Sequence, residues 1–276
     1  MFRFCDVLLL LTVVLSFLTT NKKLSLLMLA CSLISFFFEG SINFTGAFLL
    51  LAFYLYSLWH FKQNTLISFL FLIGMVSTFI LHLLPGFSNF LLFDQMQMSI
   101  TSKPFTSYVN ADKIFISLII FLNSPLQKTE KPIDLKAFKT TLFYLSITVF
   151  VLLSPAFLTH YIKFDLKYPP HFMIWALNNL FFVCFSEEVV FRGLLQKRLK
   201  ELIPKKLVFI SLSSLLFGLY HYDKGLVMIV LSFLAGIFYG LTYDKTQRLT
   251  CSMLVHFGLN LIHLICFTYP SFLTVR

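Results

Sequence analysis

Polar side chains interrupt three apolar stretches in the second half of the sequence. They are Glu187 and Glu188 with Arg192, then His221, and then His256 with Asn260. Ionisable side chains inside strongly apolar segments are costly to bury and usually have a function. Carboxylates, imidazoles and a carboxamide can together activate a water molecule and stabilise an oxyanion. The residue types therefore favour hydrolysis of an amide bond without a covalent intermediate.

The spacing within the motifs indicates how these side chains work together. Glu188 and Arg192 are four residues apart, so on a helix they share one face and can form an ion pair. This pairing leaves Glu187 without a local cation, which suits a general base or acid. His256 and Asn260 are also four residues apart. They could present two hydrogen-bond donors to one point, as an oxyanion site needs.

The composition is that of a membrane protein. Hydrophobic residues make up 58% of the 276 residues and charged residues only 12%, whereas about a quarter of a soluble domain is charged. The mean hydropathy is +0.85. Lipid must therefore be the solvent for much of the surface, and the chain is predicted to cross the membrane several times. We assign the net charge of +10 to basic residues at helix ends, which fix membrane orientation, and not to binding of nucleic acid.

The apolar runs predict an all-α fold, a polytopic transmembrane helical bundle of about 8–10 spans with an intramembrane catalytic cavity. A span needs about 20 apolar residues to cross the hydrocarbon core. No small-residue cleavage site follows the first run, which is therefore read as an uncleaved helix. The predicted spans are 4–20, 24–38, 43–60, 65–84, 140–161, 173–196, 206–222, 225–243 and 250–268.

The middle of the chain is harder to assign to spans. Residues 86–112 are mixed in composition and are predicted to form a loop at the membrane interface. Lys113 to Leu122 is apolar but only ten residues long, so it is either part of a tilted span or a re-entrant segment. A crossing there would put the loops rich in lysine and arginine on one side, which the positive-inside rule assigns to the cytoplasm. We divide the chain into an N-terminal transmembrane extension, 1–112, and a core, 113–276, that holds the polar motifs.

The three motifs lie at similar depths when measured from the basic residues at the predicted cytoplasmic surface. At about 1.5 Å per helical residue, Glu187 lies about 16 Å in, His256 about 12 Å and His221 about 22 Å. Side chains that faced lipid at this depth would lack polar partners. We therefore expect them to converge on a cavity inside the bundle. The alternative is a buried polar network that only holds helices together.

Two other hydrolytic chemistries fit the sequence less well. A glutamate and two histidines are also zinc ligands. However, the sequence has no HExxH motif, and Arg192 supplies a positive charge that a dication would oppose. A serine nucleophile lacks a GxSxG-like context. We therefore predict neither a metal nor another cofactor at this site.

Taken together, the motifs resemble those of a known family. Glu187-Glu188-x-x-x-Arg192, Phe217-x-x-x-His221 and His256-x-x-x-Asn260 match, in order and spacing, the signatures of the CPBP (Abi) intramembrane metal-independent glutamic proteases. The family includes type II CAAX prenyl endopeptidases and bacteriocin-processing or self-immunity proteins, and the resemblance covers residues 172–268. It implies that Glu187 activates water beside His221 and that Arg192 holds Glu188. It also implies that His256 and Asn260 stabilise the oxyanion.

These observations predict an intramembrane endopeptidase that cuts a peptide bond of a membrane-associated or exported substrate. The expected partners are this peptide or protein substrate and the lipid bilayer, and the expected location is a bacterial inner membrane. One alternative is a catalytically silent protein of the same fold that acts as an immunity factor or assembly partner. Another is a proton-coupled transporter, for which the sequence shows no inverted repeat.

Overall fold

The computed structural model describes residues 1–272, and packing divides the chain into two compact units. Unit 1 contains residues 1–92 and 107–129, and unit 2 contains residues 93–106 and the described residues from 130 onward. The six motif residues all lie in unit 2. Packing does not test the predicted functional division between residues 1–112 and 113–276, which stays a prediction.

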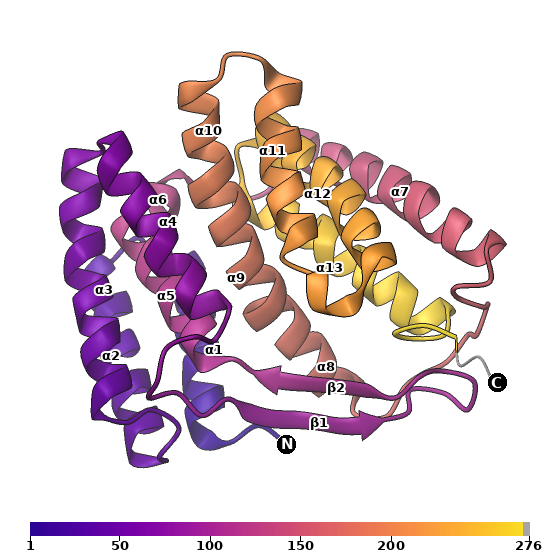
Figure 1. The fold of residues 1–276 in the computed structure, drawn as a ribbon, viewed down its shortest axis with the longest axis horizontal. Helices are drawn as coiled ribbons and strands as arrows, with labels where there is room; N and C mark the ends of the chain where they lie inside the picture. Colours follow the sequence, from indigo (N-terminus) through magenta and orange to yellow (C-terminus); the bar gives the residue numbers. More distant parts are fainter. Residues whose placement is uncertain (273–276) are drawn as a thin grey trace. The chain divides into compact units, whose positions relative to one another are not determined.

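Unit 1 is a group of helices around α5 (Ala111–Asn123). Its other helices are α1 (Phe4–Leu18), α2 (Lys22–Phe38), α3 (Phe44–Gln63), α4 (Leu66–Ile80) and α6 (Leu126–Thr129). Every residue of α5 from Ile114 to Leu122 is buried, and α5 packs against α2, α3 and α4 (Figure 1). The short apolar stretch that we predicted to be a tilted span or a re-entrant segment is therefore the enclosed centre of this unit.

Polar residues between the apolar runs of unit 1 set where its helices start and stop. The side chains of Asn21, Asn43 and Thr65 accept hydrogen bonds from backbone N–H groups in the first turns of α2, α3 and α4. These residue types are preferred helix caps for this reason. Asn64, in the left-handed conformation, ends α3.

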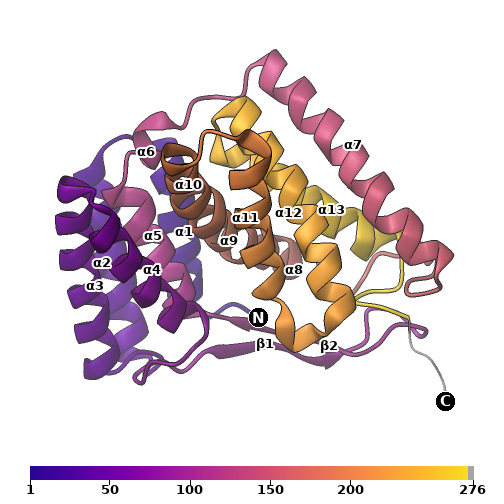
Figure 2. The same cartoon turned by 45° about the horizontal axis from the view of Figure 1, so that its top comes forward.

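Unit 2 is the helical bundle that carries the motifs. Its long helices are α7 (Leu135–Leu158), the continuous segment 172–202, α11 (Lys206–Leu219), α12 (Leu226–Thr246) and α13 (Leu249–Cys266). The 3₁₀ turn η3 (Tyr222–Lys224) lies between α11 and α12. α12 packs against α7, α11 and α13 (Figure 2). The helices of the two histidine motifs, α11 and α13, thus both lie against α12.

The segment 86–112 contains regular structure where we predicted a loop. β1 (Phe90–Met96) and β2 (Phe105–Val109) pair in a two-stranded sheet. This pairing satisfies backbone N–H and C=O groups that an irregular loop would have to leave to water or side chains. The prediction of a loop is therefore wrong for these two stretches.

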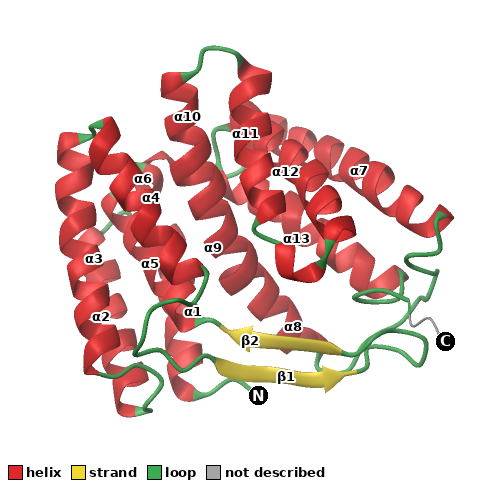
Figure 3. Ribbon diagram, viewed as in Figure 1, coloured by secondary structure: helices red, strands yellow, loops and turns green. Residues whose placement is uncertain are grey.

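The predicted fold class, an all-α polytopic helical bundle, is confirmed (Figure 3). Within residues 1–272, five helices are long and apolar enough to cross a membrane: Phe44–Gln63, Leu135–Leu158, Phe172–Leu202, Leu226–Thr246 and Leu249–Cys266. Three apolar helices of the described chain are shorter: Phe4–Leu18, Leu66–Ile80 and Lys206–Leu219. The total of eight to ten crossings stays a prediction.

Candidate active site

The two neighbouring glutamates lie on the helical segment 172–202. This segment consists of α8 (Phe172–Asn178), the π-helical turn η1 (Asn179–Cys184), α9 (Phe185–Glu188), the π-helical stretch η2 (Val189–Gln196) and α10 (Lys197–Leu202). π-helical turns are rare and often occur at functional sites. Glu187 is 7% exposed and Glu188 is fully buried. Both carboxylates therefore lie inside unit 2, between two stretches of widened helix.

Glu188 has partners on both of its carboxylate oxygens. Oε2 lies 3.3 Å from Arg192 Nε and accepts a hydrogen bond of 2.5 Å from Ser252 Oγ. Oε1 lies 3.0 Å from His256 Nδ1. A buried charge needs such partners, because its removal from water is costly. The ion pair predicted from the spacing of Glu188 and Arg192 is present, and the same carboxylate also holds a histidine of α13.

Arg192 joins the glutamate helix to α11 and α12. It is fully buried, its Nη2 donates to the backbone oxygen of Gly236 at 3.1 Å, and its guanidinium lies 4.6 Å from the ring centroid of Phe217. A Cβ atom at Gly236 would lie 3.0 Å from Ser214 Cβ. Glycine therefore permits the close approach of α12 to α11 at the level of the arginine.

His256 is held by the ring of Tyr239 and by the carboxylate of Glu188. Its ring stacks on Tyr239, with centroids 4.5 Å apart and planes at 19°. A carboxylate only accepts hydrogen bonds, so Nδ1 carries the proton that it shares with Glu188. Nε2 then lies toward the other carboxylate, 3.9 Å from Glu187 Oε2, which is beyond hydrogen-bond distance. The hydrogen bond to Glu188 thus occupies Nδ1, and Nε2 is the nitrogen of His256 that can interact with a substrate.

His221 has one nitrogen fixed in a similar way. It follows α11 and is partly exposed, and its Nδ1 lies 2.9 Å from the backbone oxygen of Phe217. Because a carbonyl only accepts, Nδ1 donates and Nε2 of the neutral ring is left as an acceptor. The Phe217 ring contacts both imidazoles, with centroids 5.0 Å from His221 and 5.9 Å from His256. Glu187 lies near enough to act on His221 electrostatically.

Asn260 belongs to a second polar group on the same face of α13 as His256. Its Nδ2 donates to Oδ1 of Asn179 at 3.2 Å and lies 4.0 Å from Cys184 Sγ. Residues four apart on a helix lie one above the other. The oxyanion donors predicted from the sequence therefore share one helix face, and Asn260 has a partner on η1.

The structure brings most of the predicted residues into direct contact. The contacting set is Glu187, Glu188, Arg192 and His256. His221 is joined to it through the ring of Phe217, and Asn260 extends it toward η1. The catalytic roles of these residues stay predictions.

Two residues that the sequence analysis did not single out hold the motif residues in place. Ser252 lies four residues before His256, so the helical spacing carried a signal that could have found it. Asn179 carried no such signal, because its partner Asn260 is 81 residues away in the chain.

The arrangement of the possible metal ligands, the His, Cys, Asp and Glu side chains, is relevant to the alternative of a zinc site. In residues 1–272, no group of three or more His, Cys, Asp and Glu side chains is placed to hold a metal ion. Glu188 and His256 bind each other, and the Arg192 guanidinium adds positive charge beside them. The prediction of a site without a metal or another cofactor stays a prediction.

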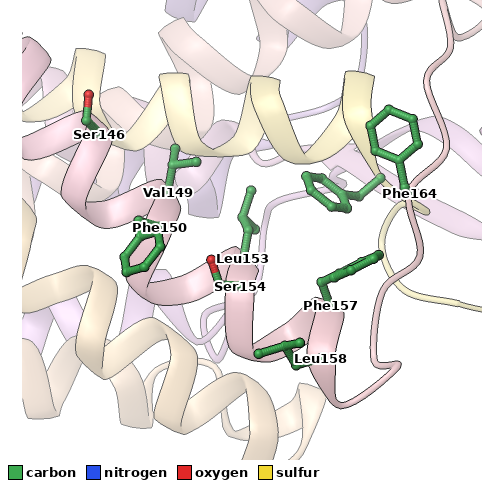
Figure 4. A pocket seen from close by; sticks show the side chains of 9 residues that line it. Ser146, Val149, Phe150, Leu153, Ser154, Phe157, Leu158 and Phe164 are labelled. Atoms are coloured by element: carbon green, nitrogen blue, oxygen red, sulfur yellow. The ribbon is translucent and has the colours of Figure 1, made fainter.

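An apolar pocket lies elsewhere in unit 2, along α7 (Figure 4). Its lining is mostly phenylalanine and leucine: Ser146, Val149, Phe150, Leu153, Ser154, Phe157, Leu158, Phe164 and Phe267. None of the six candidate residues lines this pocket. It is therefore distinct from the predicted catalytic cavity, which stays a prediction.

Comparison with known proteins confirms the family resemblance. The family model described as type II CAAX prenyl endopeptidase Rce1-like matches residues 169–262. The matched segment contains all six candidate residues. No curated protein and no solved structure matches the chain.

Proposed function

Because residues 169–262 match the family model described as type II CAAX prenyl endopeptidase Rce1-like, we propose that this protein is an intramembrane glutamic endopeptidase. One observation carries the proposal, namely the different surroundings of the two glutamates. Glu188 binds Arg192, Ser252 and His256. Glu187 is buried and meets His256 only at 3.9 Å. The carboxylate of Glu188 therefore holds the surrounding side chains in position, whereas the carboxylate of Glu187 is available to accept a proton from water.

Glu187 is the general base of the proposed reaction. It takes a proton from a water molecule while the water oxygen attacks the carbonyl carbon of the scissile peptide bond. His221 supports this step, because its Nδ1 donates to the Phe217 carbonyl and its Nε2 can accept a hydrogen bond from the same water.

His256 and Asn260 stabilise the oxyanion that the attack creates. Nε2–H of His256 and Nδ2–H of Asn260 donate to the former carbonyl oxygen. His256 enters the reaction as the imidazolium and keeps both of its protons throughout, and the Glu188 carboxylate at Nδ1 stabilises that cation. When the C–N bond breaks, Glu187 returns its proton to the departing amine. One water molecule is consumed, and the products are a carboxyl end and an amino end.

The substrate is a membrane-associated or exported peptide chain, and we place the protein in a bacterial inner membrane. The site lies among helices long and apolar enough to cross a membrane. Near one end of this bundle, Lys200 and Lys206 both pair with Asp244. The positive-inside rule assigns this basic end to the cytoplasm.

Replacement of Glu187 in cells tests the proposed function. Membrane and secreted proteins are compared by mass spectrometry in cells that carry the wild type, Glu187→Gln or Glu201→Gln. Glu201 is a matched control, because it lies on the same helical segment but is exposed and pairs with Arg198. We expect one precursor to accumulate with Glu187→Gln alone. Identical proteomes, with all three proteins inserted in equal amounts, would overturn the proposal.

The same experiment separates the proposal from a catalytically silent protein of this fold. For such a protein the polar cluster only supports packing, so Glu187→Gln lowers the amount or the thermal stability of the inserted protein and no precursor accumulates. A peptidase shows the reverse pattern, with normal insertion and a blocked cleavage.

A further inference from the structure

Two asparagines from different helices meet beside the proposed catalytic residues. Asn179, the first residue of η1, is 7% exposed. Its Oδ1 accepts a hydrogen bond of 3.2 Å from Asn260 Nδ2 and lies 3.4 Å from Cys184 Sγ. Two donors therefore converge on one carboxamide oxygen. This arrangement fixes the orientation of the Asn179 amide, because a flip would place an NH₂ group against both donors.

The π-helical turn makes this arrangement possible. Asn179 and Cys184 are five residues apart. On a regular α-helix, residues five apart point in directions that differ by about 140°. The wider π-helical turn, with its i→i+5 hydrogen bonds, brings them to neighbouring positions. η1 thus places the oxygen of Asn179 where both the thiol and α13 can reach it.

We infer that Asn179 is a positioning residue that orients the Asn260 carboxamide for oxyanion stabilisation; this inference rests on the proposed function. The NH₂ group of Asn260 has two hydrogens. Asn179 takes one of them. The other lies toward Cys184 Sγ at 4.0 Å, a weak acceptor that the oxyanion displaces. It also opposes a flip of the Asn260 amide, which would present Oδ1 to the reacting oxygen and repel it. Loss of one oxyanion donor lowers kcat by about 10²–10³-fold in other hydrolases.

A double-mutant cycle tests the inference. The probe is a quenched fluorescent peptide that spans the processing site of the precursor that accumulates in Glu187→Gln cells. The purified full-length chain is reconstituted in liposomes as wild type, Asn179→Leu, Asn260→Ala and the double variant. Leucine has nearly the shape of asparagine but cannot accept a hydrogen bond. Asn179→Asp, which keeps an oxygen at the same place, is the conservative variant.

We expect Asn179→Leu to lower kcat by about 10–100-fold with KM unchanged, since one donor is misdirected rather than removed. We expect Asn179→Asp to recover most of this loss. In the Asn260→Ala background, Asn179→Leu should have no further effect, because it acts only through Asn260. Where Asn179→Leu fails to fold, Asn179→Gln takes its place in the cycle, because its oxygen is displaced by one methylene.

Two results would overturn the inference: losses that multiply in the double variant, or a wild-type kcat for Asn179→Leu. A change in KM alone would do the same, since it would indicate a role in substrate binding. If the proposed function itself is wrong, no precursor accumulates and the wild type cleaves no such peptide. The two failures can therefore be told apart by the activity of the wild type.

Discussion

His256 Nδ1 lies 3.0 Å from Glu188 Oε1, so a carboxylate on α9 sets the position of the proton on a histidine of α13. The same carboxylate lies against Arg192 and Ser252. The orientation of the imidazole therefore depends on how α9 packs against α13, together with the stacking of the ring on Tyr239 of α12. Any variant that weakens this contact should affect both the stability and the chemistry of unit 2.

Glu188→Gln should lower both activity and stability. The amide cannot stabilise a doubly protonated His256, so we expect the cleavage rate to fall by about 10²–10⁴-fold, the usual range for acid–base catalysis. The Arg192 charge is left buried without its partner, which costs about 3–5 kcal/mol. The measurements are initial rates in liposomes and thermal unfolding in detergent.

A second variant separates these two effects of Glu188. Glu188→Gln combined with Arg192→Met removes the unpaired charge as well, so it should regain part of the lost stability but none of the activity. A double variant that remained as unstable as Glu188→Gln would show that the ion pair is not what stabilises this region.

Gly236→Ala should destabilise the bundle by about 1–3 kcal/mol through overpacking. The added Cβ would lie 3.0 Å from Ser214 Cβ and 3.1 Å from Ser214 Cα, so α11 and α12 would have to separate. Gly74→Ala is the matched control, because nothing lies within 4 Å of a Cβ at that helical glycine. Thermal unfolding in detergent compares the two. Equal effects of the two substitutions would contradict the close helix contact at Gly236.

Glu130 should give the stability of unit 2 a defined pH dependence. It lies outside the membrane-spanning helices and accepts hydrogen bonds from Leu249 N at 2.6 Å and Thr250 Oγ1 at 2.9 Å, at the start of α13. Burial raises the pKa of Glu130 above its ordinary value of 4.5. The folded protein therefore binds this proton more readily than the unfolded chain. The resulting stability is present in full below pH 4.5 and is lost as the pH rises through the folded pKa.

Comparison of the wild type with Glu130→Gln isolates this contribution, because glutamine does not titrate. As the pH falls from 7 to about 5, the difference between the unfolding midpoints should move in favour of the wild type. A difference that stayed constant, or moved the other way, would contradict the raised pKa of Glu130.

Metal chelators should leave the cleavage rate unchanged. In the proposed reaction Glu187 activates water directly, and the Arg192 guanidinium close to Glu188 opposes a dication. The measurement is the initial rate after incubation with EDTA or 1,10-phenanthroline and removal of the chelator. A loss of activity that zinc restores would favour the zinc alternative.

The lengths of the apolar runs were enough to predict the helices, because a transmembrane helix is specified largely by its own composition. The run predicted at 225–243 corresponds to α12, Leu226–Thr246. The strands were missed because β1 and β2 depend on pairing between stretches that lack a clear alternation of apolar and polar residues. The burial of α5 was missed because it depends on α2, α3 and α4, which surround it.

The candidate site was predictable where one helix contains both partners. Helical spacing predicts the ion pair of Glu188 and Arg192, and it places His256 and Asn260 on one face. It does not predict that His256 contacts Glu188, which lies 68 residues earlier in the chain. Nor does it reveal η1 and η2. The segment 172–202 contains no proline or other helix-breaking residue pair that would indicate a departure from the α-helix. Contacts between helices depend on tertiary packing, which a single sequence does not display.

In the proposed reaction, Glu187 activates the water that cleaves the peptide bond. The most direct test is the initial rate of cleavage of the precursor-derived peptide by the purified wild type, Glu187→Gln and Glu201→Gln in liposomes, with thermal unfolding measured for each. Glu187→Gln should lose at least about 10²-fold in rate at an unchanged unfolding midpoint, while Glu201→Gln keeps the wild-type rate. Cleavage by Glu187→Gln at the wild-type rate would contradict this role of Glu187.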